Sequence, residues 1–407
     1  MNTNESFKLS LHTDPLEVLL NIPPIQIYIQ GEARSAVYRY ITSFTWRTQI
    51  PAREDWENGP PMKAEITWYA DGSKTQEEVG TGIYEPRTKR KISIPMASEI
   101  VATDTPIIGV LSQETYIISG LFPNVTYDSY IAASYVKFVE SAGARAVPVW
   151  IGQDESYYRR VVDYTNGLLF PGGGTYFNET GGYGEAATYL YRFAIDSNRS
   201  GNYYPIWGTC LGMQVLMYAS LNGTKDVRLD CSLTNVAIPL NFSKDYENSR
   251  MFSRTPDETI NILKSKNVTY NQHRYCLTKA SLKENDLLDD WQILATNIDS
   301  NGLEFISAME HRTYPLYGVQ FHPEKNQFEF KKNKGFPHSE QSVRVAQHFA
   351  NFFVGECRKN ANRFPNDDVE VRSLIYNFNP KYTGMNNSYY EQIYTFVKKD
   401  FERVQLL

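Results

Sequence analysis

A cysteine flanked by glycines, between a predicted strand and a predicted helix, constrains the fold of this 407-residue chain more than any other feature. Residues 203–207 have the composition of a short buried strand, and residues 211–220 carry apolar side chains at helical spacing. Cys210 lies at their junction, where a strained backbone requires small neighbours such as Gly208 and Gly212. The positive end of the helix favours the thiolate. We therefore predict a turn that presents Cys210 as a nucleophile.

A histidine about a hundred residues downstream has the pattern of a partner for this cysteine. Residues 317–321 have the composition of a core strand, and His322 follows directly. Pro323 ends the strand, and Glu324 is close enough in sequence to turn back to the imidazole. A thiol hydrolase needs a nucleophile, a base and an orienting carboxylate. We assign these roles to Cys210, His322 and Glu324.

A third apolar strand, predicted at residues 167–170, runs into the glycine triplet 172–174. Glycine leaves backbone N–H groups open to a developing oxyanion, so we expect the N–H groups of Gly173 and Leu211 to form the oxyanion hole. Each pattern alone has a plainer interpretation: a packing turn, a loop, or a surface turn. All three in this order, each at the end of an apolar strand, favour an active site.

These motifs resemble the class I glutamine amidotransferase superfamily, whose members hydrolyse γ-amides of glutamate. More closely, residues 105–113, 207–210 and 314–325 resemble the folate γ-glutamyl hydrolases, and the likeness extends over residues 105–360. The resemblance implies a cysteine hydrolase that cleaves γ-glutamyl isopeptide bonds of folyl or antifolate poly-γ-glutamates through a thioester. The alternatives are a glutaminase subunit that passes ammonia to a synthetase, and an inactive binding module.

The resemblance also implies two substrate-binding residues. His273, in the sequence Asn271-Gln272-His273-Arg274, stands where the family has a second histidine near the substrate. A loop histidine bonded to the backbone is the alternative. Gln214 is a departure, because the hydrolases tend to have an acidic residue there and the amidotransferases a glutamine. How the α-amino group of the substrate is held therefore stays open.

The order of predicted elements indicates the fold class. Strands are predicted at 107–111 and 146–151, and helices at 130–142, 156–163 and 183–196. This alternation predicts an α/β fold, a mostly parallel sheet covered by helices on both faces, as in class I glutamine amidotransferases. Residues 291–296 and 303–309 predict an antiparallel hairpin. An amphipathic helix is predicted at 339–359, with one apolar face formed by Val343, Ala346, Phe349, Ala350 and Phe353.

The first hundred residues resemble a different family, the polyproteins of non-LTR retrotransposons. Residues 67–74 and 80–84 are similar to the first strands of their ribonuclease H domain, in which the residue matching Asp71 binds Mg²⁺. A two-metal nuclease needs several clustered carboxylates, and the family pattern is lost near residues 93–95, with Glu99 a possible further acid. We therefore expect a truncated ribonuclease H-like fragment without nuclease activity. The predicted divisions are residues 1–104, the hydrolase domain 105–360, and a C-terminal extension 361–407.

Composition limits the partners. The net charge of −5 does not indicate a protein that binds nucleic acid. The basic run at residues 87–91 is typical of a solvated linker. The sequence has no run of 18 or more apolar residues, so it predicts no membrane span. No Cys or His pair has the spacing of a metal site, so we expect no metal and no cofactor. Beside Cys210, three cysteines remain, which permits at most one disulfide. A homodimer is left open.

Glycosylation motifs bear on the compartment. Beyond residue 104 the chain has Asn-x-Ser/Thr sequons at Asn124, Asn178, Asn198, Asn222, Asn241, Asn267 and Asn386. About three would arise by chance, so this enrichment favours a secretory history. The resembled family is lysosomal or secreted. Residues 1–20 show no signal-peptide pattern, however, so the chain as written is expected to stay in the cytosol.

Overall fold

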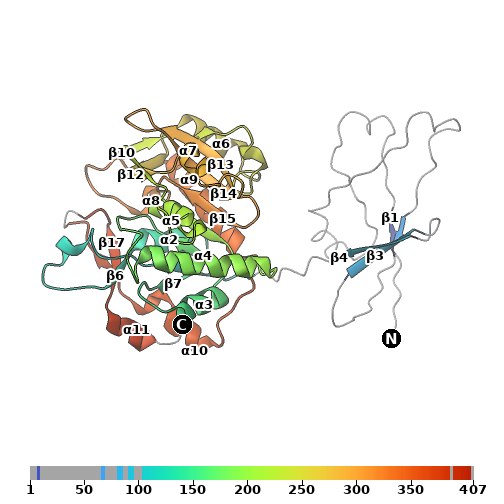
Figure 1. Cartoon of the computed structure of the whole chain (residues 1–407), viewed down its shortest axis with the longest axis horizontal. Helices are drawn as coiled ribbons and strands as arrows, with labels where there is room; N and C mark the ends of the chain where they lie inside the picture. Colours follow the sequence, from blue (N-terminus) through green and yellow to red (C-terminus); the bar gives the residue numbers. More distant parts are fainter. Residues whose placement is uncertain are drawn as a thin grey trace. The chain divides into compact units, whose positions relative to one another are not determined.

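The computed structural model describes residues 7–9, 66–68, 80–85, 90–95, 103–385 and 388–404. The chain divides into two units, residues 1–99 and residues 100–407, drawn in Figure 1. In the first unit β1 (Phe7–Leu9) pairs with β2 (Ile66–Trp68), and β3 (Gly80–Glu85) pairs with β4 (Arg90–Pro95), both antiparallel. The residues predicted as carboxylates of a nuclease site, Asp71 and Glu99, lie outside the described residues.

An eight-stranded sheet forms the centre of the second unit. Its spatial order is β11 (Asn241–Phe242), β13 (Trp291–Ile298), β14 (Glu304–His311), β15 (Leu316–Val319), β9 (Ile206–Thr209), β8 (Gly167–Phe170), β5 (Ile107–Leu111) and β7 (Arg145–Val149). The last five strands are parallel, and the first three pair antiparallel. This confirms a mostly parallel sheet and the predicted β13–β14 hairpin. The parallel strands are buried, as expected of a sheet covered on both faces.

The described part of this unit has ten α-helices: α2 (Ala133–Glu140), α3 (Glu155–Tyr164), α4 (Tyr183–Arg199), α5 (Leu211–Ser220), α6 (Asp257–Ser265), α7 (Lys279–Lys283), α8 (Lys325–Phe328), α9 (Glu340–Cys357), α10 (Asp367–Ser373) and α11 (Lys398–Val404). Helix α2 joins β5 to β7, toward the β7 edge of the sheet. Helix α3 joins β7 to β8 and α4 joins β8 to β9, both in the opposite direction along the sheet. Right-handed crossovers therefore place α2 on one face, with α9 packed against it, and α3 and α4 on the opposite face. Among the described residues, no helix combines the length and apolarity needed to cross a bilayer.

Two smaller sheets complete the unit. One pairs β10 (Leu229–Ile238) with β12 (Thr269–Cys276), antiparallel. The other has the order β16 (Lys381–Tyr382), β17 (Gln392–Phe396), β6 (Ser129–Ala132). Residues after 360 thus pair with a strand that precedes α2, and they belong to the same unit as the large sheet.

Two local predictions were wrong. The helix expected at 130–142 begins only at Ala133, because Tyr130 to Ala132 pair with β17, a long-range contact that no local pattern announces. Val343, expected on the apolar face of α9, is 36% exposed. The other four residues of the predicted face, Ala346, Phe349, Ala350 and Phe353, are buried, and Ser342 and Val345 continue the buried face in place of Val343.

Candidate functional site

Cys210 lies on the predicted turn between β9 and α5. Its backbone has φ 53° and ψ −107°, in the left-handed region that side chains disfavour. A Cβ on Gly208 would lie 2.5 Å from the Gly212 carbonyl oxygen, and one on Gly212 would lie 1.8 Å from the Phe170 carbonyl oxygen. Both glycines are therefore required for this turn. It places the cysteine sulfur at the N-terminal end of α5, where helix N–H groups favour negative charge.

His322 lies at the end of the neighbouring strand β15, and the structure brings it together with Glu324 and Cys210. Its Nδ1 atom lies 2.8 Å from Glu324 Oε1, and both side chains are buried. Burial by itself lowers the pKa of His322, but the Glu324 carboxylate and the hydrogen-bonded Cys210 sulfur outweigh burial and raise this pKa to about 9. Conversely, burial raises the pKa of Glu324 less than the His322 charge lowers it. A protonated imidazole at neutral pH follows.

Tyr135 of α2 connects this pair to the glycine loop. Its hydroxyl oxygen lies 3.3 Å from His322 Nδ1 and accepts a hydrogen bond from the Gly172 N–H at 2.8 Å. A Cβ on Gly172 would lie 2.7 Å from that hydroxyl and 2.8 Å from the His322 ring. The glycine is therefore needed for the close approach of the loop to the histidine. Sequence reasoning missed Tyr135, which nothing distinguishes from the other tyrosines of the chain.

Two buried glutamines form a hydrogen-bonded chain that ends at the cysteine, and one of them, Gln214, also lines the pocket that contains Cys210. Gln320 Nε2 donates to Cys210 Sγ at 3.4 Å, and its Oε1 accepts from Gln214 Nε2 at 3.0 Å. Gln214 Nε2 also donates to the carbonyl oxygen of Tyr275 at 2.7 Å. Gln214, predicted as a substrate-binding residue, therefore holds Gln320 in its orientation toward the sulfur. Gln320 belongs to the Gln-Phe-His-Pro-Glu motif, but its contact with Cys210 depends on the pairing of β15 with β9.

The glycine triplet 172–174, which includes Gly173 of the predicted oxyanion hole, lies at the same sheet edge as Cys210. Gln113, which follows β5, donates from Nε2 to the carbonyl oxygens of Pro171 and Gly172 at 3.0 and 3.3 Å. A Cβ on Gly173 would lie 1.8 Å from Gln113 Oε1, so a side chain there would displace this brace. Gly173 and Leu211 both line the pocket that contains Cys210 and His322.

This pocket has a volume of about 550 Å³. Three cationic side chains line it: Arg228, Arg274 and Lys325. Exposed aromatic rings also line it, namely Tyr116, Tyr176, Tyr275 and Tyr389. Tyr389 comes from the C-terminal segment that was predicted to lie outside the hydrolase domain. The lining can contact both flat rings and carboxylates.

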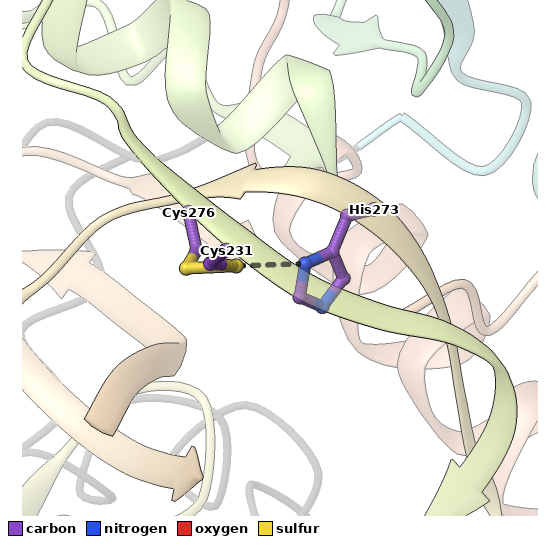
Figure 2. Close-up of side chains that lie close together, drawn as sticks. All are labelled: Cys231, His273 and Cys276. Carbon is purple, nitrogen blue, oxygen red and sulfur yellow. Dashed lines mark hydrogen bonds between the residues drawn. A yellow bond between two sulfur atoms is a disulfide. The ribbon is translucent and has the colours of Figure 1, made fainter. Parts of the chain in front are cut away.

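His273 of β12 lines the same pocket and is 5% exposed. Its Nε2 lies 3.2 Å from Asn271 Oδ1, and its Nδ1 lies 3.3 Å from Cys231 Sγ (Figure 2). Burial, with a smaller contribution from His322, lowers the pKa of His273 to about 3. Cys231 and Cys276 form a disulfide, within the predicted limit of one, while Cys210 and Cys357 are free and buried.

Comparison with known proteins identifies the family. The Peptidase C26 family model matches residues 106–324. The gamma-glutamyl hydrolase of Rattus norvegicus is 42% identical over 294 residues, which cover 72% of this chain and 89% of the relative. Gamma-glutamyl hydrolase B of Dictyostelium discoideum is 37% identical over 74% of this chain and 88% of its own length, and gamma-glutamyl hydrolase 1 of Arabidopsis thaliana is 34% identical over 72% and 83%. The chain therefore belongs to the gamma-glutamyl hydrolase family of C26 peptidases.

Proposed function

We propose that this protein hydrolyses the γ-glutamyl bonds of folyl and antifolate poly-γ-glutamates. The observation that carries the proposal is the assembly of Cys210, His322 and Glu324 beside an aromatic and cationic pocket, in a chain of this family. The raised pKa of His322 supports an imidazolium beside the Cys210 sulfur, and a cationic neighbour favours the thiolate form of a cysteine. A thiolate is the nucleophilic form of cysteine.

In the first half of the reaction, the Cys210 thiolate attacks the γ-carbonyl carbon. The N–H groups of Gly173 and Leu211 donate to the oxyanion that forms. His322 transfers its proton to the departing amine as the carbon–nitrogen bond breaks, which leaves a thioester on Cys210. In the second half, His322 takes a proton from water, the hydroxide attacks the thioester, and the thiolate leaves. Glu324 holds the imidazole and stabilises its charge throughout.

Substrate recognition follows from the lining of the pocket. The α-carboxylates of a γ-linked glutamate chain are free, and guanidinium groups bind carboxylates with paired hydrogen bonds. We assign this role to Arg274, because Nε and Nη2 of Arg228 already donate to Asp226, and we assign His273 as a neutral partner of the bound γ-glutamyl residue. The flat pterin or antifolate ring would lie against the exposed tyrosines at the rim.

The test compares two substrates and three proteins. Unmodified protein is expected to release glutamate or shorter folates from a pteroyl-poly-γ-glutamate, measured by chromatography, and to leave free glutamine intact. Cys210→Ala should abolish the activity, and Cys357→Ala, which changes the other free buried cysteine, should retain it. Ammonia release from glutamine without γ-glutamyl cleavage would support the glutaminase. Loss of both activities in the unmodified protein would support the binding module.

We further propose that the protein passes through the secretory pathway and acts in lysosomes or outside the cell. Sequon asparagines at 124, 178, 222, 241 and 267 are exposed, as glycan attachment requires. Treatment of protein from its native source with peptide N-glycosidase should increase its electrophoretic mobility. An unchanged mobility would contradict this route.

For residues 1–104 we propose descent from a retrotransposon without nuclease activity. The proposal rests on the Tyr69-Ala70-Asp71-Gly72-Ser73 sequence and on the loss of the family pattern near residues 93–95, before the positions of the further metal ligands. Full-length protein with Mg²⁺ should leave an RNA–DNA hybrid intact. Mg²⁺-dependent cleavage that is lost in Asp71→Asn would contradict it.

A further inference from the structure

Cys231, His273 and Cys276 form a cluster with the donor atoms of a metal site. Their two sulfurs and one ring nitrogen all lie within 4.8 Å of one another, and all three residues are buried (Figure 2). Cys231 belongs to β10, and the other two belong to the neighbouring strand β12. In the structure the two cysteines are joined as a disulfide.

A register shift brings these side chains together. Asp230 pairs with Tyr275 and Leu233 pairs with His273, so three steps along β10 match two steps along β12. The additional residue on β10 is a bulge, which re-aims side chains that a regular ladder would alternate between faces. Cys231 lies in this bulge. Cysteines 45 residues apart, from two strands, therefore have no motif spacing that sequence analysis could detect.

The hydrogen bonds of Asn271 determine which nitrogen of His273 carries the proton. Asn271 Nδ2 donates to the Thr269 carbonyl oxygen at 2.9 Å, so its Oδ1 faces His273 Nε2 at 3.2 Å. An oxygen acceptor there requires Nε2–H, which leaves a lone pair on Nδ1, 3.3 Å from Cys231 Sγ. A disulfide sulfur has no proton to donate. In the oxidised form this buried lone pair thus receives no hydrogen bond from Cys231.

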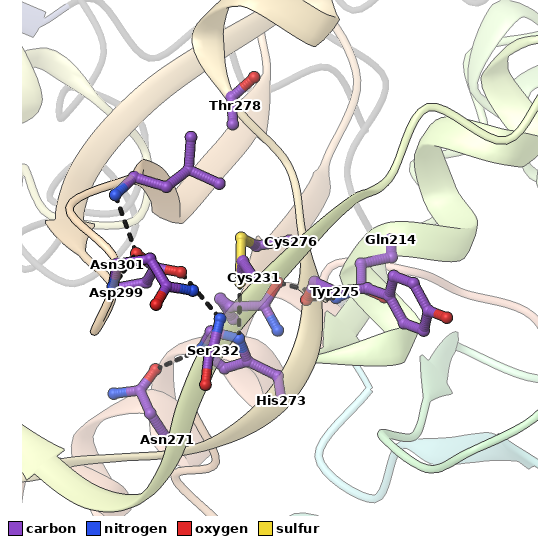
Figure 3. Close-up of a disulfide and its surroundings, with 12 residues drawn as sticks. Gln214, Cys231, Ser232, Asn271, His273, Tyr275, Cys276, Thr278, Asp299 and Asn301 are labelled. Atoms are coloured by element: carbon purple, nitrogen blue, oxygen red, sulfur yellow. Dashed lines mark hydrogen bonds between the residues drawn. A yellow bond between two sulfur atoms is a disulfide. The ribbon is translucent and has the colours of Figure 1, made fainter.

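The surroundings hold the cluster independently of the sulfur–sulfur bond (Figure 3). Asp299 Oδ2 accepts from the Ser232 N–H at 2.8 Å, and Asp299 Oδ1 accepts from Asn301 and Leu303. On the other side, Gln214 donates to the carbonyl oxygen of Tyr275. The backbone next to each cysteine is therefore anchored by bonds that reduction leaves intact.

We propose that, once the disulfide is reduced, Cys231, Cys276 and His273 bind a zinc ion through two thiolates and Nδ1. Two sulfurs and one nitrogen are ligands that zinc prefers, with Zn–S and Zn–N bonds of about 2.3 and 2.05 Å. Tetrahedral angles then put sulfur and nitrogen about 3.6 Å apart, close to the observed 3.3 Å. Asn271 supplies the second-shell acceptor that metal-bound histidines have. His273 lines the pocket, and it is the member of the cluster past which an ion would enter.

The chemistry balances with a thiol or phosphine reductant. Two electrons and two protons convert the disulfide to two thiols; a dithiol reductant becomes a disulfide in turn, and a phosphine becomes a phosphine oxide with the oxygen of water, whose two protons go to the thiols. Zinc then displaces both thiol protons to the solvent. Oxidising compartments favour the disulfide and reducing ones the zinc form, so the two forms exclude one another. The proposal does not rest on the hydrolase activity.

The experiment uses the full-length chain with Cys210→Ala, so that the Cys210–His322 pair cannot bind the ion. The protein is reduced with a phosphine, given zinc, desalted and analysed for bound metal; cobalt(II) replaces zinc for spectroscopy. The reduced form is expected to retain about one zinc per chain and to show thiolate-to-cobalt charge transfer. The oxidised form should do neither.

Variants separate this site from adventitious binding. Cys231→Ser, Cys276→Ser and His273→Gln should each lose the bound zinc, and Asn271→Ala should weaken it about 10- to 100-fold. Cys357→Ser should bind zinc as its parent does. Because serine variants also lose the disulfide, thermal unfolding checks that they are folded, and the reduced parent protein tests the site with all ligands present. Equal zinc in both redox forms, zinc retained without His273, or a disulfide that resists reduction in the folded protein would each overturn the proposal.

Discussion

His322 and His273 are both buried beside a cysteine sulfur in one pocket, yet the pKa of one is raised to about 9 and that of the other is lowered to about 3. The group at the remaining ring nitrogen differs. Nδ1 of His322 meets the Glu324 carboxylate, and Nε2 of His273 meets the neutral amide of Asn271. A carboxylate, together with the free Cys210 sulfur, stabilises the imidazolium of His322 against burial, whereas an amide and a disulfide sulfur give His273 no compensating charge. One imidazole is thereby suited to proton transfer and the other to serve as a neutral ligand.

Removal of the Glu324 carboxylate should have the largest effect on the difference between the two histidines. Glu324→Gln should lower kcat by up to about 10⁴-fold, because the imidazole loses its charge partner and its preferred tautomer. Steady-state kinetics on a pteroyl-poly-γ-glutamate measure the effect, with circular dichroism to check the fold. A kcat within tenfold of the unmodified protein would mean that Glu324 is not needed to orient His322.

The glutamine chain that ends at Cys210 tests how the sulfur is held. Gln320→Ala should lower kcat about 10- to 100-fold, because a hydrogen bond to a charged sulfur contributes about 1.5–3 kcal/mol. Gln214→Ala should have a smaller effect, about fivefold, because Gln214 acts on the sulfur through Gln320. A raised KM with unchanged kcat in Gln214→Ala would instead favour the substrate-binding role predicted from the sequence.

The raised pKa of His322 predicts the alkaline limit of the reaction. Above pH of about 9 the imidazole loses the proton that the leaving amine needs, so kcat should fall about tenfold per pH unit. The free energy of unfolding should depend on pH in the same direction. The interaction of protonated His322 with Glu324 stabilises the fold fully below the unfolded-state pKa of about 6.5. This contribution is lost as the pH rises through about 9. In Glu324→Gln the alkaline limb of activity should move to lower pH. A limb that stays in place would assign it to another group.

Asn271→Asp gives His273 the kind of partner that His322 has. The carboxylate should raise the pKa of His273 above about 3, as seen in an NMR titration of the oxidised protein. It should also lower the free energy of unfolding by about 1–3 kcal/mol, because an oxygen would then face the Thr269 carbonyl. Asn271→Ala is the control that removes the amide without adding charge. Equal pKa values in the two variants would refute the explanation by partner charge.

Much of the parallel half of the fold was predictable because its signals are local. The helix from Leu211 to Ser220 and the strand ending at Phe170 follow from apolar runs and from glycines that the turn requires, whereas the strand expected at residues 203–207 is observed at Ile206–Thr209. β6 was missed because its pairing partner lies more than 250 residues away in β17. The C-terminal segment was separated from the hydrolase domain for the same reason, although its Tyr389 lines the pocket.

The sequence by itself determined the nucleophile turn, the His322–Glu324 pair and the family, because each is encoded in a few consecutive residues with restrictive geometry. Tertiary structure decided which residues complete the site. The strand pairing of β15 with β9 brings Gln320 to Cys210, helix packing brings Tyr135 to His322, and a bulge in β10 brings Cys231 to His273 and Cys276. These contacts depend on register and burial across distant segments, which no local pattern of side chains specifies.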